Sequence, residues 1–130
     1  MKLFDYCDHR GINRIAAWTR ELQPEDRAKL WAKLLILEKL SVDQLPGYLK
    51  GPIQREKEIY KLQIGASGSR VALRPMVCRG PGEKNTEITL LVGAEERGGK
   101  LPKGIGATAE KYRQHILQDS TRRCPHEWVS

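Results

Sequence analysis

Basic side chains between positions 50 and 84 are the groups whose type and spacing best suit chemistry. They outnumber the acidic side chains of that stretch, which are Glu56, Glu58 and Glu83. The basic set is Lys50, Arg55, Lys57, Lys61, Arg70, Arg74, Arg79 and Lys84. Ammonium and guanidinium groups bind phosphate oxygens and stabilise negative charge that develops on them. The net charge of +7 favours binding to a polyanion such as RNA, DNA or an acidic protein. Such a charge also increases the solubility of a protein.

Cysteine and histidine form a second candidate constellation. Cys7-Asp8-His9 and Cys124-Pro125-His126 repeat a Cys-x-His pattern near the two chain ends. Zinc ligands usually come in pairs spaced by two to four residues, so we expect no metal here. With Cys78, the cysteines number three and are widely spaced. An odd count without a disulfide framework favours a reducing compartment, and we expect a cytoplasmic protein.

Other functional classes find no support in the sequence. There is no GxGxxG, P-loop, nucleophile elbow or EF-hand pattern, so we expect no cofactor. No apolar run is long enough to cross a bilayer, and no secretory signal is visible. The length of 130 residues fits one domain, and the 39% hydrophobic and 30% charged residues are ordinary for a globular protein.

The elements that must position the basic groups begin with two helices. Apolar residues spaced by three and four predict a helix over residues 13–22. Pro24, followed by Glu25 and Asp26, predicts the start of a second helix that runs to about Leu40. The short connection predicts a helical hairpin. A last helix is expected over about 108–117.

The middle of the chain changes to the period of strands. Residues 59–64 alternate, so that Ile59, Lys61 and Gln63 share one face. Residues 71–77 predict a second strand, in which Pro75 implies an edge position or a bulge. Residues 88–92 are the most apolar and should be central. The opening segment, 2–7, could add a further strand.

We therefore predict an α+β fold with a short, twisted antiparallel sheet, an N-terminal helical hairpin on one face and a C-terminal helix. Residues 1–118 should form one domain, with 119–130 as a tail of uncertain order. The second face of the sheet would be half open. It would carry Lys61, Gln63, Arg70 or Arg74 as a concave basic surface.

Residues 48–94 resemble the RelE/ParE toxin superfamily. The resemblance lies in the order and spacing of short segments. These are Leu49-Lys50-Gly51, the strand 58–64 (Glu-Ile-Tyr-Lys-Leu-Gln-Ile), the turn 66–69 closing on Arg70-Val71, and the strand 87–94.

The early part is similar to the phage-derived HigB branch of that superfamily. It carries Trp18 and Leu22 in the first helix and Asp26-Arg27-Ala28-Lys29 in the second. The resemblance covers roughly residues 3–117. It implies a RelE-like fold and the toxin of a type II toxin–antitoxin module, bound to a cognate antitoxin in a hetero-oligomer. RelE and HigB relatives cut messenger RNA on the ribosome and so inhibit translation, whereas ParE relatives poison DNA gyrase.

The resemblance also implies site residues. Lys61 matches the first of two strand lysines in a RelE-type site, and Arg70 matches the arginine that closes the hairpin. Arg97 is the third catalytic candidate. We expect the RNA to contact further basic residues, namely Lys50, Lys57, Arg74, Lys100 and Lys103.

The match to a RelE-type site is partial. Gln63 replaces the second strand lysine, Glu95 stands where a basic residue is expected, and Leu101 falls near the position of a tyrosine. Arg97, Lys100, Lys103, Tyr112 and His115 are candidates to supply the missing groups. Tyr112 more plausibly belongs to the core, and His115 to the helix surface.

Three hypotheses about function remain open. The first is a ribosome-dependent endoribonuclease, which needs a base for the 2′-hydroxyl, an acid for the leaving oxygen and positive charge on the phosphate. The second is a gyrase inhibitor without catalysis. The third is a catalytically degenerate member of the family that only binds a partner.

Overall fold

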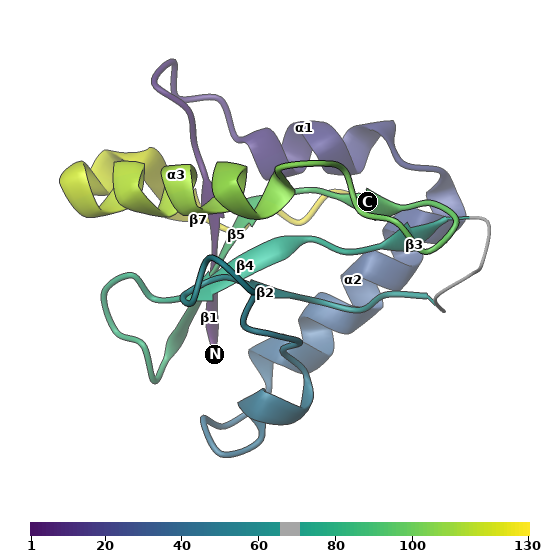
Figure 1. Ribbon diagram of the computed structural model, residues 1–130, viewed down its shortest axis with the longest axis horizontal. Helices are drawn as coiled ribbons and strands as arrows, with labels where there is room; N and C mark the ends of the chain where they lie inside the picture. Colours follow the sequence, from purple (N-terminus) through teal and green to yellow (C-terminus); the bar gives the residue numbers. More distant parts are fainter. Residues whose placement is uncertain (66–70) are drawn as a thin grey trace.

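Residues 1–65 and 71–130, which the computed structural model describes, form an α+β fold with three α-helices and a five-stranded, mostly antiparallel sheet (Figure 1). The sheet order is β2 (Tyr60–Lys61), β4 (Met76–Arg79), β5 (Glu87–Val92), β1 (Lys2–Tyr6) and β7 (Arg123–Pro125). A separate two-stranded ladder pairs β3 (Ala72–Leu73) with β6 (Glu95–Glu96). As predicted, β5 is the central strand and the opening segment forms a strand.

The first two helices begin where the sequence predicts. The Asn13 side chain accepts a hydrogen bond from the Ala16 N–H and caps α1 (Arg14–Glu21). Pro24 occupies the first turn of α2 (Pro24–Glu38), where its missing N–H costs nothing. In Figure 1, α2 doubles back obliquely below α1. α3 (Ile105–Gln118) begins three residues earlier than expected, directly after Gly104.

The predicted second strand is interrupted at Pro75. Ala72 and Leu73 pair with β6, whereas Met76 begins β4 in the main sheet. The register between β4 and β5 shifts between Met76 and Val77, and β4 lies between two neighbours. Pro75 itself belongs to neither strand, so the prediction of one strand over residues 71–77 is wrong. The irregularity expected at Pro75 appears as this break and as the register shift directly after it. A proline lacks the N–H that a continuous ladder would need.

The pairing of β1 departs from the expected antiparallel sheet. β1 runs parallel to β5, with Leu3 opposite Ile88. Parallel neighbours need a long connection, and here α1, α2, β2 and β4 all lie between them in the chain. Every other pairing in the five-stranded sheet is antiparallel.

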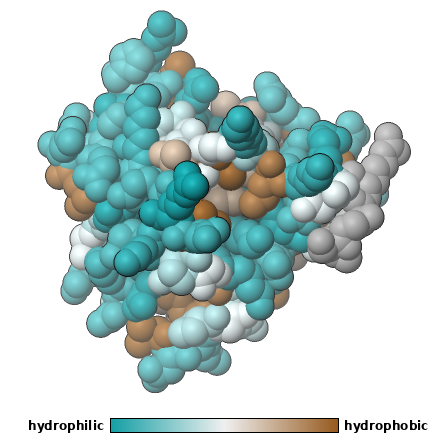
Figure 2. Space-filling model, viewed as in Figure 1, coloured by the Kyte–Doolittle hydropathy of each residue, from teal (hydrophilic) through white to brown (hydrophobic). Residues whose placement is uncertain are grey.

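Helices cover both faces of the sheet. Ile15 of α1 and Leu30, Leu34 and Leu37 of α2 share one buried cluster with Ile88 and Leu90 of β5. On the other face, Ala109 and Ile116 of α3 pack with Tyr6, Met76, Cys78 and Leu91. We call this second side the α3 face. Seen as in Figure 1, the surface is mostly hydrophilic, with apolar residues in small separate areas, one near the middle of the view (Figure 2).

The segment after residue 118 belongs to the sheet. β7 pairs with β1, and Cys124 forms a disulfide with Cys7 at a Cα–Cα distance of 6.4 Å. Cys78 is free and buried. The interpretation of the cysteines as lacking a disulfide framework is therefore wrong, and the reducing compartment loses that support. The sequence could not indicate this pair, because 117 residues separate its members.

None of the helices in the described part of the chain is long and apolar enough to cross a membrane.

Candidate nucleic-acid interface

Lys50 and Lys61 lie directly opposite each other at the β2 edge of the sheet. The Lys50 N–H donates to the Lys61 carbonyl at 2.9 Å, and the Lys61 N–H donates to the Lys50 carbonyl at 2.9 Å. Residues that exchange both hydrogen bonds in an antiparallel pair have Cα atoms about 5.5 Å apart and side chains on the same side. Two cations from sequence-distant segments thus stand side by side. We call them the lysine pair.

The lysine pair belongs to the α3 face. Lys61 is opposite Met76, which is buried in the cluster under α3, and Ile59, two residues earlier, is buried there too. The phase predicted for residues 59–64 is therefore confirmed. Lys50 is exposed and Lys61 half-buried. Like charges placed opposite each other destabilise a sheet. Among the described residues, no carboxylate forms an ion pair with either lysine.

Arg97 and Lys100 form a second pair of opposed cations. Each donates its backbone N–H to the carbonyl of the other, at 3.0 and 3.1 Å. The turn between them consists of Gly98 and Gly99, both at positive φ (57° and 76°). Positive φ at both central residues is the requirement of a type I′ hairpin turn. We call this element the basic hairpin. Arg97 also binds Glu95 at 3.0 Å.

The structure does not bring Arg97 to Lys61. Met76 links the row of Lys61 to Val92, and Arg97 comes five residues after Val92. Glu95 lies opposite Leu73, which in turn lies opposite Ile64, three residues beyond Lys61. Three residues of a strand span about 10 Å, and Arg97 is two residues further along the chain from Glu95. Lys57 and Lys103 are exposed in two different turns, before β2 and before α3. Arg70 lies outside the described residues, so its expected place beside Lys61 stays a prediction.

Arg74 is not available to RNA, which corrects its assignment as an RNA contact. The side chain is 1% exposed and forms an ion pair with Glu96 at 3.5 Å. Its Nη1 donates to the carbonyls of Leu73 and Ile64, at 2.9 and 3.3 Å. The guanidinium lies inside, beside the bridge between Ile64 and Leu73, and donates to two carbonyls that already accept backbone hydrogen bonds from each other's residues. Sequence alone cannot separate an inward from an outward arginine beside a proline.

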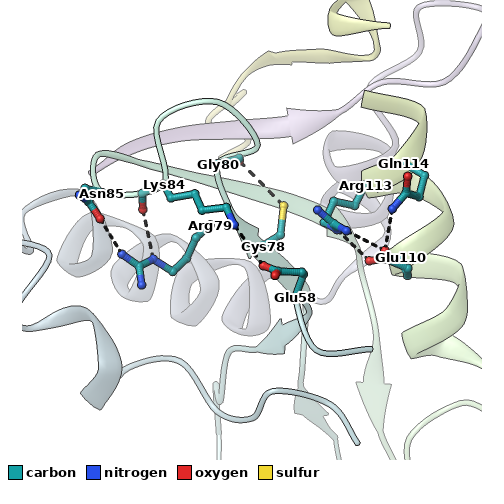
Figure 3. A network of polar contacts seen from close by, with 9 residues as sticks. All are labelled: Glu58, Cys78, Arg79, Gly80, Lys84, Asn85, Glu110, Arg113 and Gln114. Carbon is teal, nitrogen blue, oxygen red and sulfur yellow. Dashed lines mark hydrogen bonds and ion pairs between the residues drawn. The ribbon is translucent and has the colours of Figure 1, made fainter. Parts of the chain in front are cut away.

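Two other cations of the basic stretch hold the loop between β4 and β5 (Figure 3). Arg79 donates to the Lys84 carbonyl at 3.1 Å and to Asn85 at 3.0 Å, and Lys84 pairs with Glu58 at 3.6 Å. Beside them, burial raises the pKa of the Cys78 thiol to about 12. The figure also shows Glu110 of α3 between Arg113 and Gln114. Arg79 and Lys84 therefore have structural partners, whereas the lysine pair has no ion-pair partner among the described residues.

A polar cluster that the sequence did not predict joins β1, α3 and the segment after α3. The Tyr6 hydroxyl lies 2.7 Å from Nδ1 of His115, and Arg122 donates to both groups. Tyr112 stacks on Tyr6 at 4.1 Å between ring centroids. Because a guanidinium only donates, Nδ1 must be the unprotonated nitrogen of His115. Tyr112 is half-buried and packs against the core cluster under α3, which agrees in part with its predicted place in the core. His115 is not a simple surface residue.

The environment of this cluster shifts two pKa values. Burial, followed by the charges of Arg122 and Lys111, lowers the pKa of His115. Burial raises the pKa of Tyr6, against the opposing effect of Arg122. Tyr6 lies on β1, three strand intervals from β2, or about 14 Å across the sheet. His115 therefore does not supply a proton to a group bound at the lysine pair.

Asp5 links β1 to the last residues of the chain. Its buried carboxylate lies 2.7 Å from Nδ1 of His126 and accepts from Asn13 at 2.8 Å and from the Glu127 N–H at 2.9 Å. The two Cys-x-His motifs thus meet in space, but through a disulfide and this carboxylate. No group of three or more potential ligands that could hold a metal ion occurs among the described residues.

No protein-family model matches the chain, and neither a curated protein nor a solved structure does so.

Proposed function

We propose that this chain is a toxin of the RelE/ParE type and that it cuts messenger RNA on the ribosome. The observation that carries the proposal is the lysine pair. Lys50 and Lys61 stand opposite each other on the α3 face without a carboxylate among the described residues to neutralise them. A site that keeps two cations together in this way is suited to a phosphate group.

The chemistry that such a pair serves is attack by a ribose 2′-oxygen on the adjacent phosphorus. The O2′–P bond forms, the P–O5′ bond breaks, and the 2′-proton is transferred to a base while the leaving oxygen gains a proton. Negative charge accumulates on the phosphorus oxygens in the transition state. Two ammonium groups held side by side stabilise that charge, and such fixed electrostatic groups are commonly worth factors of about 10²–10³ in rate.

The order of the elements supports a RelE-like fold for the same chain. A strand and two helices precede three strands of the main sheet, β2, β4 and β5, and α3 follows. The basic strand β2 is the last strand of the main sheet on this side, and Lys50 pairs with its outer edge. In this proposal, the partners are the ribosome, messenger RNA and a cognate antitoxin that forms a hetero-oligomer with the toxin in the cytoplasm.

One observation favours a second function, binding without catalysis. Arg97 is distant from Lys61 and paired with Glu95, and Arg74 is buried. His115 contacts Tyr6 of β1, which is three strand intervals from β2. Among the described residues, no histidine or carboxylate forms a hydrogen bond or an ion pair with either side chain of the lysine pair. A gyrase inhibitor or a degenerate family member would need no group for proton transfer.

A translation extract with a reporter messenger RNA tests the proposal. The native chain should produce ribosome-dependent cuts, and the Lys50→Gln and Lys61→Gln variants should reduce cutting by about 10²-fold or more. Lys29→Gln, which removes an exposed charge from α2, is the matched control and should cut normally.

Absence of cuts with the native chain would overturn the catalytic proposal. Trapped gyrase–DNA complexes in the same preparation would then support the gyrase inhibitor. Normal cutting by Lys61→Gln would show that the lysine pair is not the site.

A further inference from the structure

A shallow hollow of about 370 Å³ lies beside the basic hairpin, away from the lysine pair. It is lined by Trp18 of α1, Gly93 and Glu95 after β5, Arg97 and Lys100 of the hairpin, and Pro102. Trp18 packs against the core between the sheet and the first two helices. The hollow therefore combines an aromatic group from one layer with cations from a loop.

Gly93 makes room for the indole ring. A Cβ at this position would lie 2.0 Å from Cδ2, 2.3 Å from Cγ and 2.4 Å from Cε2 of Trp18. These distances are far inside van der Waals contact, so the fused edge of the indole rests on the Gly93 backbone. Trp18 is half-buried, and its remaining surface borders the hollow. The indole thus forms a fixed flat wall.

The hairpin places two cations at the same hollow. The Gly98-Gly99 turn keeps Arg97 and Lys100 opposite each other, with their side chains on one side of the ribbon. Glu95 neutralises one of the two charges through its ion pair with Arg97, leaving a net positive site. The Arg97 side chain is 66% exposed, so it can reach a ligand from solution.

We propose that this hollow binds one nucleotide of single-stranded RNA, with the base stacked on Trp18 and its phosphate held by Arg97 and Lys100. An aromatic face accepts any base, and guanidinium and ammonium groups bind phosphate oxygens. The hollow has the volume of a small-ligand pocket. The choice of RNA as ligand rests on the proposed function, but the hollow is separate from the lysine pair and anchors the strand without taking part in cleavage.

Binding of a labelled adenosine ribohexamer, followed by fluorescence anisotropy at about 50 mM salt, tests this inference. The full-length native chain should bind the hexamer, and Trp18→Leu should weaken binding about tenfold. The double variant Arg97→Gln/Lys100→Gln, whose changes lie on an exposed turn, should weaken it at least as much. Lys29→Gln/Lys39→Gln removes two exposed charges from the region of α2 and should bind like the native chain.

Two results would overturn the inference: unchanged affinity in both the Trp18 and the hairpin variants, or hexaglutamate competing as well as unlabelled hexamer. The latter would identify an acidic protein as the ligand. Because Trp18 contacts the core, the affinity of Trp18→Leu is compared with that of the native chain at equal concentrations of folded protein. If Trp18→Leu does not fold, the result of the Arg97→Gln/Lys100→Gln variant alone tests the inference.

The outcomes also separate the two proposals. Hexamer binding that depends on the hollow, in a chain that never cuts messenger RNA, would retain the hollow and reject the nuclease. If Lys61→Gln abolishes cutting while the hollow variants bind the hexamer like the native chain, the nuclease proposal is retained and the hollow is rejected as an RNA site.

Discussion

Among the described residues, like charges lie opposite each other at two places. Lys50 faces Lys61, and Arg97 faces Lys100, in each case across a pair of backbone hydrogen bonds. Such pairs reduce the stability of the folded chain. By contrast, the buried Arg74 and the loop residue Arg79 have well-defined partners. Arg74 and Arg79 thus support the fold, whereas the two opposed pairs of cations can bind an anion from solution.

His115 should make stability depend on pH. Its pKa is lowered in the folded chain, by burial and then by Arg122 and Lys111, whereas in the unfolded chain it titrates near about 6.5. As the pH falls below that value, the unfolded chain takes up the proton first, so the free energy of unfolding decreases until the lower folded pKa is reached. At pH values well above the pKa of the unfolded chain, His115 is neutral in both states and does not change the free energy of unfolding. Urea denaturation between pH 7 and 5 should therefore show a flatter pH dependence for His115→Gln.

His9→Gln is the control for this experiment, because His9 is exposed. It should retain the slope of the native chain. A slope that His115→Gln leaves unchanged would mean that the cluster of Tyr6, His115 and Arg122 does not disfavour the imidazolium form.

At the scale of elements, the two N-terminal helices are started by different means. The Asn13 side chain caps α1 and also donates to the buried Asp5. Gln23, at the same position of α2, makes no side-chain capping bond, and Pro24 starts that helix instead. The first helix is thus attached to β1 through its cap, and the second depends on its apolar face.

Asn13→Ala should lower the free energy of unfolding by about 1–2 kcal/mol, because it removes a cap and leaves Asp5 with one donor fewer. Gln23→Ala is matched in position and should change it by less than about 0.5 kcal/mol. Chemical denaturation monitored by circular dichroism measures both. Equal effects of the two substitutions would contradict the role of the Asn13 side chain.

For the whole molecule, the disulfide joins the first strand to the last. Cys7 and Cys124 close a loop of more than a hundred residues, and cross-links of that span commonly contribute about 2–5 kcal/mol. Asp5, His126 and Glu127 form polar contacts beside it. β7 is therefore held to β1 by a covalent bond as well as by the sheet.

The double variant Cys7→Ser/Cys124→Ser should lose about 2–5 kcal/mol of unfolding free energy. The native chain should show the same loss when a reductant is added, whereas the variant should not respond to it. Cys78→Ala retains the disulfide and should still respond. Urea titrations with and without reductant measure these differences, and a native chain indifferent to reductant would contradict the cross-link.

The fold was largely predictable from local patterns. Apolar spacing located the three helices, because burial on one side of a helix imposes that period. Alternation placed Lys61 on the correct face of β2. The parallel pairing of β1 with β5 was not predictable, since nothing in either segment encodes the direction of a neighbour 85 residues away.

The candidate site was predictable only in part. Lys61 and Lys50 were named, but their pairing depends on the turn between residues 51 and 60 and not on any motif. The prediction that Arg74 contacts RNA was wrong, because the sequence does not indicate whether a basic side chain in a strand turns inward. Tyr6 and His115 meet across 109 residues, so no local spacing could join them.

The position of β1 has a consequence for synthesis. β1 is made first, yet its two neighbours, β5 and β7, are made among the last segments of the chain. Contacts between such distant segments slow folding. While the chain is being translated, β1 must wait unpaired until residue 92 has left the ribosome, whereas Lys50 and Lys61 can meet through a short local turn. The cations would therefore come together in the nascent chain before the sheet behind them is complete.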